Sequence, residues 1–220
     1  MKLLFISLLI LGFSFPFAAG SVAGEIDECW SELSVSCEGM RISICPRRDF
    51  EYIGEGCGGT DDYIEIWVRD AGGYGVAGIP ETDYCLFACD ANEELSICYF
   101  FITADSVTSA MEAFRGRTTF SRSRIAGGGC ALNGVCMAVQ GKVVLDEECI
   151  HPICLDIEIV SPDINGDLDV DLSDLSFFGE AYNTQEGEPG YSACCDYNDD
   201  GVCDLSDFAF FGQHYTHQCL

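Results

Sequence analysis

Apolar and polar residues alternate in several short runs along the first two thirds of the chain. In "YIEIWVRD", Ile64, Ile66 and Val68 alternate with polar or aromatic residues, which is the period of a half-buried β-strand. The same alternation occurs in "MRISIC" at residues 40–45 and in "LDIEIV" at residues 155–160. Glycine-rich pieces such as "DAGGYG" and "AGGGC" separate these runs, so the pattern predicts many short strands joined by turns.

Residues 130–145, "CALNGVCMAVQGKVVL", are predicted to form hairpins. The pairs Asn133–Gly134 and Gln140–Gly141 supply residues that tolerate the positive φ of tight hairpin turns. No long amphipathic helix interrupts the strand pattern before residue 160. We therefore expect a β-sandwich over residues 25–160.

Helical spacing appears near the C-terminus. Two segments each carry three apolar residues at i, i+3 and i+7, which places the three on one face of a short helix. Two such faces are expected to pack together and to close a small core that neither helix could form alone. The two trios are Leu175, Phe178 and Tyr182, and Phe208, Phe211 and Tyr215.

These two segments belong to an internal repeat. Eleven of twenty positions are identical between residues 163–182, "DINGDLDVDLSDLSFFGEAY", and residues 196–215, "DYNDDGVCDLSDFAFFGQHY". The identities include positions 1, 3, 5, 9 and 12 of a calcium-binding loop, where side-chain oxygens are needed. Because such a loop wraps the ion, alternate residues point inward, and a hard cation that takes about six to eight oxygens is the expected ligand.

Each loop supplies six predicted calcium ligands, and the ligand at position 7 is a backbone carbonyl. In the first loop, residues 163–174, the ligands are Asp163, Asn165, Asp167, Asp169 (carbonyl), Asp171 and Asp174. In the second loop, residues 196–207, they are Asp196, Asn198, Asp200, Val202 (carbonyl), Asp204 and Asp207. We therefore expect two Ca²⁺ sites.

The two loops differ at position 6, where the chain must turn sharply. Gly201 occupies this position in the second loop, whereas Leu168 occupies it in the first. A positive φ at Leu168 costs about 1–2 kcal/mol, unless the backbone turns differently there. We therefore expect the second site to bind Ca²⁺ more tightly than the first.

Both loops end in aspartate at position 12, where an EF-hand has glutamate, and this tandem arrangement resembles the type I dockerin family. The resemblance covers about residues 161–220. It implies two loop–helix repeats that bind Ca²⁺ and attach the protein to a cohesin-like or other cell-surface partner. In dockerins, loop positions 10 and 11 help to select that partner. Here they are Leu172–Ser173 and Leu205–Ser206, which differ from the small polar pair of cellulosomal dockerins.

A second resemblance concerns the β-rich part. "IWVRDAGGYGVAGIP" at residues 66–80 resembles the strand, turn and strand of bacterial immunoglobulin-like modules. "GRTTFSRSRIAGGGC" at residues 116–130 resembles the threonine-rich strand that follows in such modules. The resemblance implies a spacer or adhesive sandwich. We therefore expect a mainly β immunoglobulin-like sandwich at residues 25–160, followed by a small α-helical, dockerin-like module at residues 161–220.

The N-terminal and cysteine patterns predict a secreted or cell-surface protein. Residues 1–20 contain one lysine, an apolar run and then small residues, as in a secretory signal peptide, with a membrane anchor as the alternative. No later stretch is long and apolar enough to be a transmembrane segment. The 15 cysteines are expected to form disulfides, with zinc ligation as the alternative, and their odd number leaves at least one thiol free or bonded to another chain.

The sequence allows more than one disulfide pairing within the repeats. Cys203, at position 8 of the second loop, is expected to be either a buried thiol or bonded to Cys194, Cys195 or Cys219. Cys219, near the C-terminus, is expected to close the module by pairing with Cys194 or Cys195.

Charge and histidine content narrow the function. The net charge of −27, from 37 acidic and 10 basic residues, argues against nucleic acid or an anionic membrane as partner and favours cations. His214 and His217 are expected to be exposed at a helix end, with a transition-metal site as the alternative. Only His151 lies outside the repeats, and no nucleophile motif or phosphate loop is present, so we expect no catalysis.

The expected function is non-catalytic attachment or assembly at the cell surface. A structural calcium clamp on an adhesive sandwich is one alternative. A small carbohydrate-active domain that carries a dockerin and binds a glycan is the other, because a sequence does not show whether two carboxylates pair in space for sugar hydrolysis.

Overall fold

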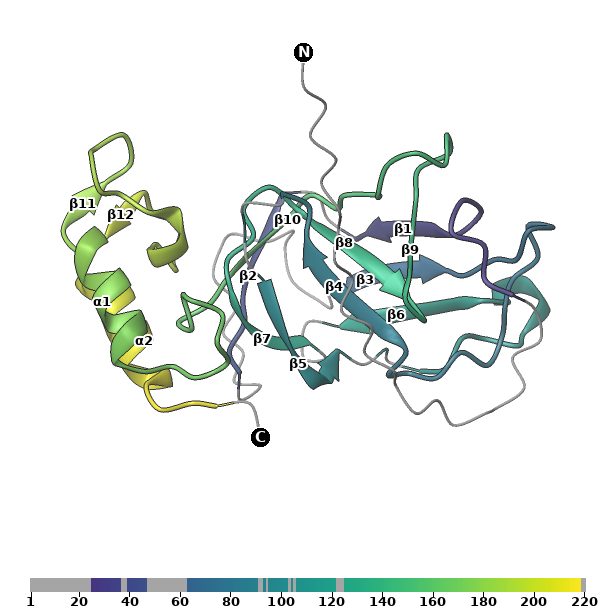
Figure 1. Ribbon diagram of the computed structural model, residues 1–220, viewed down its shortest axis with the longest axis horizontal. Helices are drawn as coiled ribbons and strands as arrows, with labels where there is room; N and C mark the ends of the chain where they lie inside the picture. The colour runs from purple at the N-terminus through teal and green to yellow at the C-terminus, as the bar shows by residue number, and fades with distance from the viewer. Residues whose placement is uncertain are drawn as a thin grey trace, which may run out of the picture.

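The computed structural model describes residues 25–36, 39–46, 63–90, 93, 95–102, 104, 106–121 and 125–218. The predicted signal peptide and Cys219 lie outside these ranges. Across the described ranges, no helix combines the length and the apolar character needed to cross a membrane. Figure 1 shows a β-rich part and, beside it, a pair of helices from the C-terminal end of the chain.

Within the described residues, the β-rich part contains four small sheets, as the alternating patterns predict. Two sheets have three antiparallel strands each. The strand order of one is β1 (Glu32–Val35), β3 (Tyr63–Trp67) and β6 (Arg117–Ser121). The strand order of the other is β4 (Tyr84–Ala88), β8 (Val135–Val139) and β9 (Lys142–Val143). The other two are the antiparallel pair β5 (Leu95–Ile102) and β7 (Ile125–Gly129), and the parallel pair β2 (Met40–Ser43) and β10 (Ile157–Val160). The three alternating runs of the sequence therefore form β3, β2 and β10.

One hydrophobic core joins these sheets. Ile64 and Ile66 of β3 are buried in it, as their alternation predicts, and Met137 of β8 enters it from the other three-stranded sheet. The Tyr84 ring of β4 packs edge-on against the Phe120 ring of β6, with 4.7 Å between ring centroids. The mainly β prediction is confirmed, and two sheets packed on a shared core are consistent with a sandwich.

One of the two predicted hairpin turns is wrong. Gln140–Gly141 joins β8 to β9 with positive φ at both residues, as predicted. Asn133–Gly134 does not join a hairpin, because β7 before it pairs with β5 and β8 after it pairs with β4. Glu93 accepts hydrogen bonds from the Asn133 amide groups, and Gly134 lies close against the carbonyl of Leu155. Long-range contacts therefore set the path of the chain at this turn.

The two predicted helical faces pack against each other. The helices are α1 (Leu172–Ala181) and α2 (Leu205–His214), which lie side by side in Figure 1. The Phe178 ring lies 5.8 Å from the rings of both Phe208 and Phe211. The prediction of a small core shared by both repeats is therefore confirmed.

The composition of this small core differs in part from the prediction. Tyr182 and Tyr215 stay partly exposed, whereas Tyr197 and Phe210, which lie outside the predicted trios, are buried. His214 is also buried, so its predicted exposure is wrong. It occupies the last turn of α2 on the same face as Phe210, and the two ring centroids are 4.6 Å apart.

The segment after each helix pairs with the loop of the other repeat. After α1, β11 (Thr184–Gln185) pairs antiparallel with β12 (Val202–Cys203) of the second loop. After α2, the His217 carbonyl accepts from the Val170 amide of the first loop, at 2.9 Å. Val170 and Cys203 both occupy position 8, so each repeat stabilises the loop of the other in the same way.

A disulfide between Cys130 and Cys194 ties the helix pair to the residue that follows β7. This bond contradicts the predicted pairing of Cys194 with Cys203 or Cys219. Cys195 and Cys203 are buried free thiols, so the pairings of Cys195 are also wrong, and the buried-thiol interpretation of Cys203 is confirmed. Residues distant in the sequence meet here because β7 ends beside the repeats. Among the described residues of the β-rich part, Cys29–Cys149 and Cys89–Cys154 form two further disulfides.

Candidate metal centre

The two repeated loops each bury a carboxylate at both ends. Asp163 and Asp196 occupy position 1, and Asp174 and Asp207 occupy position 12. The exposed fraction of each is 0% or 1%. Aspartates are almost never fully buried unless they are paired or coordinate a metal. Four of them in one small module therefore need a specific local reason.

In the first loop, backbone amides donate hydrogen bonds to these two carboxylates. Asp163 Oδ2 accepts from the Leu168 amide at 2.8 Å. Asp174 Oδ1 accepts from the Asn165 amide at 3.1 Å, and its Oδ2 accepts from the Asp171 amide at 2.8 Å. The carboxylates at both ends of the loop thus bind backbone amides of the residues between them, which holds the loop in a compact turn.

The second loop repeats the same hydrogen bonds at the same positions. Asp196 Oδ2 accepts from the Gly201 amide at 2.9 Å. Asp207 accepts from the amides of Asn198 and Asp204 at 3.3 and 2.9 Å. A geometry that recurs in both repeats indicates that the repeated aspartates and asparagines are selected by position rather than by general acidity.

The side chains at positions 3 and 5 also face one another. Asn165 Nδ2 donates to Asp167 Oδ2 at 3.0 Å, and Asn198 Nδ2 donates to Asp200 Oδ2 at 2.8 Å. The amide oxygens of both asparagines accept from the backbone of position 5. The side chains at positions 3 and 5 are therefore in contact in each loop, and the carboxylates at positions 1 and 12 accept hydrogen bonds from the backbone amides of positions 5 and 3.

The acids at positions 9 and 12 also cap the helices. The Asp171 and Asp204 side chains accept the Ser173 and Ser206 amides at 2.6 and 2.7 Å. The position 12 side chains accept the amides of these capping residues, which completes a capping box at each helix. Helix capping therefore accounts for part of the acid pattern, but it does not account for the buried aspartates at position 1.

The loops turn where the sequence predicts. Leu168 has a φ of 72°, and Gly201 at the same position has a φ of 82°. Of the two alternatives at Leu168, the backbone therefore adopts the positive φ, which is strained for a branched side chain. Position 4 has positive φ as well, at Gly166 and Asp199, which the sequence analysis missed. Glycine and aspartate at this position are compatible with that turn.

Electrostatics inside the loops favour a cation. Burial, together with the nearby charges of Asp174 and Asp167, raises the pKa of Asp163 to about 7 against the opposing hydrogen bond from Leu168. Burial likewise raises the pKa of Asp174 and of Asp207 above the ordinary range. Each of these shifts indicates that negative charge is costly in the loop.

The donor set in each loop fits a hard divalent cation. Carboxylate and amide oxygens make up the predicted side-chain ligands, and these suit Ca²⁺ rather than a soft metal. The remaining predicted ligand in each loop is the backbone carbonyl at position 7. The residues at this position form antiparallel β-pairs, Asp169 with Gln218 and Val202 with Gln185. The residues present are therefore compatible with two Ca²⁺ ions.

Residues outside the two loops also contact position 1, and Gly128, Arg41 and Tyr191 among them were not identified from the sequence. A Cβ at Gly128 in β7 would overlap the Asp163 carboxylate, so only glycine fits there. Arg41 Nη1 donates to the Asp196 carbonyl at 3.1 Å, and the Tyr191 hydroxyl donates to Asp196 Oδ2 at 2.8 Å. "AGGGC" was expected to be a turn, but Gly127–Gly129 belong to the buried strand β7.

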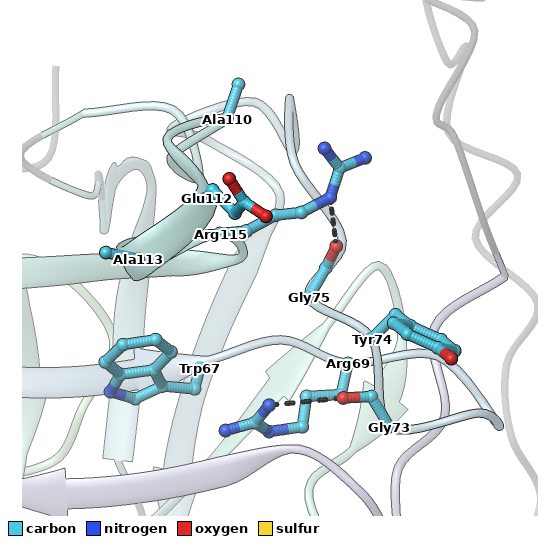
Figure 2. Close-up of a pocket in the computed structure, with 9 residues that line it drawn as sticks. All are labelled: Trp67, Arg69, Gly73, Tyr74, Gly75, Ala110, Glu112, Ala113 and Arg115. Atoms are coloured by element: carbon cyan, nitrogen blue, oxygen red, sulfur yellow. Dashed lines mark hydrogen bonds between the residues drawn. The ribbon is translucent and has the colours of Figure 1, made fainter.

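A separate pocket of about 660 Å³ opens on the β-rich part, and Figure 2 shows its lining. Arg69 donates to the Gly73 carbonyl at 3.2 Å, and its guanidinium carbon lies 5.7 Å from the centre of the Trp67 ring. Glu112 is the one carboxylate among the nine described lining residues, whereas glycoside hydrolysis normally uses two. The side chains in this lining that carry rings or charge are Trp67, Arg69, Tyr74, Glu112 and Arg115.

Comparison with known proteins gives limited information. No protein-family model matches the chain, and no curated protein matches it. A type II cohesin–X–dockerin complex from Acetivibrio cellulolyticus, mutated at an N-terminal interface, matches 65% of this chain and 83% of its own chain at 15% identity, with a TM-score of 0.25. A second match, to a C-terminal interface mutant of that complex, covers 85% of this chain and 97% of the other chain at 13% identity, with a TM-score of 0.27. Both scores are low, so the function is argued from this chain's own residues.

Proposed function

We propose that this protein is an exported, non-catalytic attachment protein whose repeats fold around two Ca²⁺ ions and bind a partner protein at the cell surface. The supporting observation is the burial of four aspartates at positions 1 and 12 of the two loops. Burial of an uncompensated carboxylate costs several kcal/mol, and a bound cation removes that cost. The immunoglobulin-like type of the β-rich part and the secretory signal peptide belong to the same proposal.

Each ion is held by the six ligands that the repeat supplies. Bound Ca²⁺ supplies the positive charge that offsets the crowded carboxylates, and the loop then fixes the start of the helix that follows it. The ligands of the first ion are Asp163, Asn165, Asp167, Asp169 (carbonyl), Asp171 and Asp174. The ligands of the second are Asp196, Asn198, Asp200, Val202 (carbonyl), Asp204 and Asp207.

The start of each helix presents the docking surface. Leu172 and Leu205 occupy position 10 of the two loops, and each is 65% exposed. Ser173 and Ser206 beside them are exposed as well. Two equivalent exposed leucines on one small module suit a protein partner with an apolar surface, such as a cohesin-like protein. Because Ca²⁺ orders the helix starts, removal of Ca²⁺ releases the partner.

A calcium clamp is the nearest alternative, and contacts between the two parts favour it. The Cys130–Cys194 disulfide fixes the repeats to the β-rich part. Arg41, which is buried, pairs with Glu158 of β10 and with Asp199 of the second loop, at 3.0 Å for the latter. In this alternative, Ca²⁺ only rigidifies the end of the chain, and no partner is lost when it is removed.

Calorimetric titration of the purified protein with Ca²⁺ tests the metal sites. Two sites are expected, and Asp196→Asn should remove the tighter one, because it removes the position 1 charge with little change in shape. Asp199→Asn is the matched control, since it removes the same charge at a non-ligand position of the same loop. Absence of binding at millimolar Ca²⁺, or equal losses in the two variants, would refute the metal sites.

Capture from the source cell envelope, with Ca²⁺ or with chelator, tests attachment. The wild-type protein should retain a partner only in Ca²⁺, and the double variant Leu172→Asp with Leu205→Asp should retain none while still binding two Ca²⁺ ions. If the double variant captures the same protein as wild type, the helix starts are not the docking surface. If chelator changes the stability but no calcium-dependent partner is captured, the clamp is the correct function.

The pocket on the β-rich part supports a second candidate, glycan binding. Trp67 and Tyr74 offer ring faces to a sugar, and Arg69, Arg115 and Glu112 offer hydrogen bonds to its hydroxyl groups. Tyr74 is 74% exposed, so Tyr74→Ala should abolish binding on a glycan array without unfolding the protein. An array on which the wild-type protein binds no glycan would exclude this role.

A further inference from the structure

Sulfur and nitrogen donors from three residues meet where the β-rich part contacts the helix pair. Cys45 Sγ, a His214 ring nitrogen and a His217 ring nitrogen all lie within 4.8 Å of one another. The Cys45 Sγ and His217 Nδ1 atoms are 3.2 Å apart. Cys45 and His214 are buried, and His217 is half-buried. No residue of the two calcium loops belongs to this cluster.

The backbone around these residues brings them together. Cys45 follows β2, whose direction is fixed because the Ile44 amide donates to the Val160 carbonyl of β10 at 2.9 Å. His214 ends α2, and Thr216, with a φ of 72°, then turns the chain sharply. The His217 amide donates to the His214 carbonyl at 2.9 Å, which places the two imidazoles on one turn, with ring centroids 5.2 Å apart.

We propose that Cys45, His214 and His217 bind a Zn²⁺ ion that joins the end of α2 to the end of β2. One thiolate and two imidazoles are borderline-soft donors, which suit Zn²⁺ and other late transition metals and do not suit Ca²⁺. A tetrahedral zinc ion with one sulfur and two nitrogen ligands holds its donors roughly 3.3–3.6 Å apart. The Cys45 and His217 donors, 3.2 Å apart, lie close to this spacing, and the His214 nitrogen lies within 4.8 Å of both, so side-chain rotations bring the three donors onto the ion.

Among the described residues, the cluster supplies three of the four ligands of a tetrahedral zinc ion. On binding, the Cys45 thiol loses its proton to solvent, and the two imidazoles bind as neutral rings, so zinc affinity rises with pH. Unlike the calcium loops, this site links two parts of the chain that are far apart in the sequence, because Cys45 lies near the N-terminus and His214 near the C-terminus. It is therefore a separate clasp between the helix pair and the β-rich part, and it does not depend on the proposed calcium function.

Cobalt substitution of the purified, metal-free protein tests this site directly. One equivalent of Co²⁺ should produce the visible bands of tetrahedral cobalt together with a near-ultraviolet thiolate charge-transfer band. Zn²⁺ should displace the cobalt and remove both signals, whereas a large excess of Ca²⁺ should leave them unchanged. Absence of the thiolate band would overturn the proposal.

Variants identify the ligands. Cys45→Ser should lower the affinity for Zn²⁺ at least a hundredfold and remove the charge-transfer band, and His217→Gln should lower the affinity at least tenfold. The matched controls are Cys85→Ser, an exposed free thiol, and His151→Gln, an exposed histidine beside Asp146. Both controls should bind Zn²⁺ like wild type. Unchanged affinity in Cys45→Ser would overturn the proposal.

A chemical measurement on the unmutated protein covers the case in which Cys45→Ser does not fold. Bound Zn²⁺ should slow alkylation of Cys45 at least tenfold, as measured by peptide mapping, while alkylation of Cys85 stays unchanged. Discovery of Cys45 in a disulfide by non-reducing mapping, or equal alkylation of Cys45 with and without Zn²⁺, would contradict the site.

Discussion

The two calcium-type loops share one hydrogen-bond pattern but lie in different surroundings. Asp163, at position 1 of the first loop, is packed against Gly128 of β7. It accepts a hydrogen bond from the amide of Leu168 at position 6, whose backbone has a strained positive φ. Position 1 of the second loop, Asp196, receives the Tyr191 hydroxyl, and position 6 is an unstrained Gly201. The first loop thus fits closely against the β-rich part, whereas the second receives hydrogen bonds from the side chains of Tyr191 and Arg41.

This difference shows that a repeated motif does not give the two loops equal surroundings. The local sequence sets the hydrogen bonds within each loop, and these are nearly the same. The rest of the chain sets the burial and the polar neighbours of each loop, and these differ. Substitutions that act through the shared core should affect both loops, whereas those that act through the surroundings should affect one loop only.

Phe178→Ala should have the largest effect and should weaken both loops. The Phe178 ring is buried at the contact between α1 and α2, so its loss should destabilise the helix pair by about 3–5 kcal/mol. Ca²⁺ affinity should fall at both sites. Urea denaturation followed by helical circular dichroism measures the first effect, and calorimetry measures the second.

Phe177→Ala is the matched control, because this neighbouring ring on α1 is 47% exposed. Its effect on unfolding should stay within about 0.5 kcal/mol. If Phe178→Ala weakened only the first site, the two loops would not share a core in the way that the ring contacts indicate.

Gly128→Ala should act on the first loop alone. The added methyl would overlap the Asp163 carboxylate, and the forced movement should cost about 2–3 kcal/mol of unfolding free energy. Affinity for Ca²⁺ at the first site should fall at least tenfold, with little change at the second. The measurement is calorimetric titration, because the two proposed sites are expected to differ in affinity.

Gly179→Ala controls for the loss of a glycine. Gly179 lies in α1 with open space around its Cβ position, so alanine should stabilise the protein by about 0.5–1 kcal/mol. An equal loss at both sites in Gly128→Ala would show that β7 supports the whole module rather than the first loop.

The parts of this structure that follow from local pattern were predictable. Strand β3 could be predicted because Ile64 and Ile66 alternate with polar neighbours, and the helix pair because Phe178 and Phe211 recur at helical spacing. The position of Leu168 in the loop indicated a sharp turn there, although it left open whether its φ would be positive. Each of these features depends on residues that are close together in the sequence.

The features that depend on distant residues could not be predicted. Nothing near Cys130 indicates that it pairs with Cys194, and nothing near Arg41 indicates that it contacts the second loop. The burial of His214 arises because the end of α2 packs beside β2, far away in the sequence. Such contacts are set by how the β-rich part and the repeats pack together, which no local periodicity records.

Exchange of the side chains at position 6 should reverse the order of affinities. Leu168→Gly relieves the strained φ, so the first site should gain about 1 kcal/mol, or roughly fivefold in Ca²⁺ affinity. Gly201→Leu imposes the same strain on the second site and should weaken it by about 1–2 kcal/mol. Calorimetry on the two single variants and on the double exchange measures each change. Similar affinities in all variants would show that position 6 does not set the difference.

Tyr191→Phe should have the smallest effect, confined to the second loop. The hydroxyl donates to Asp196 Oδ2 at 2.8 Å and orients that carboxylate, so its loss should weaken the second site by about 1 kcal/mol, roughly fivefold. Tyr182→Phe, which removes a hydroxyl from a partly exposed ring that follows α1, should leave both sites unchanged. If both variants left calorimetric titration unchanged, polar contacts from outside the loop would not contribute to the predicted tighter binding at the second site, and that prediction would rest on Gly201 alone.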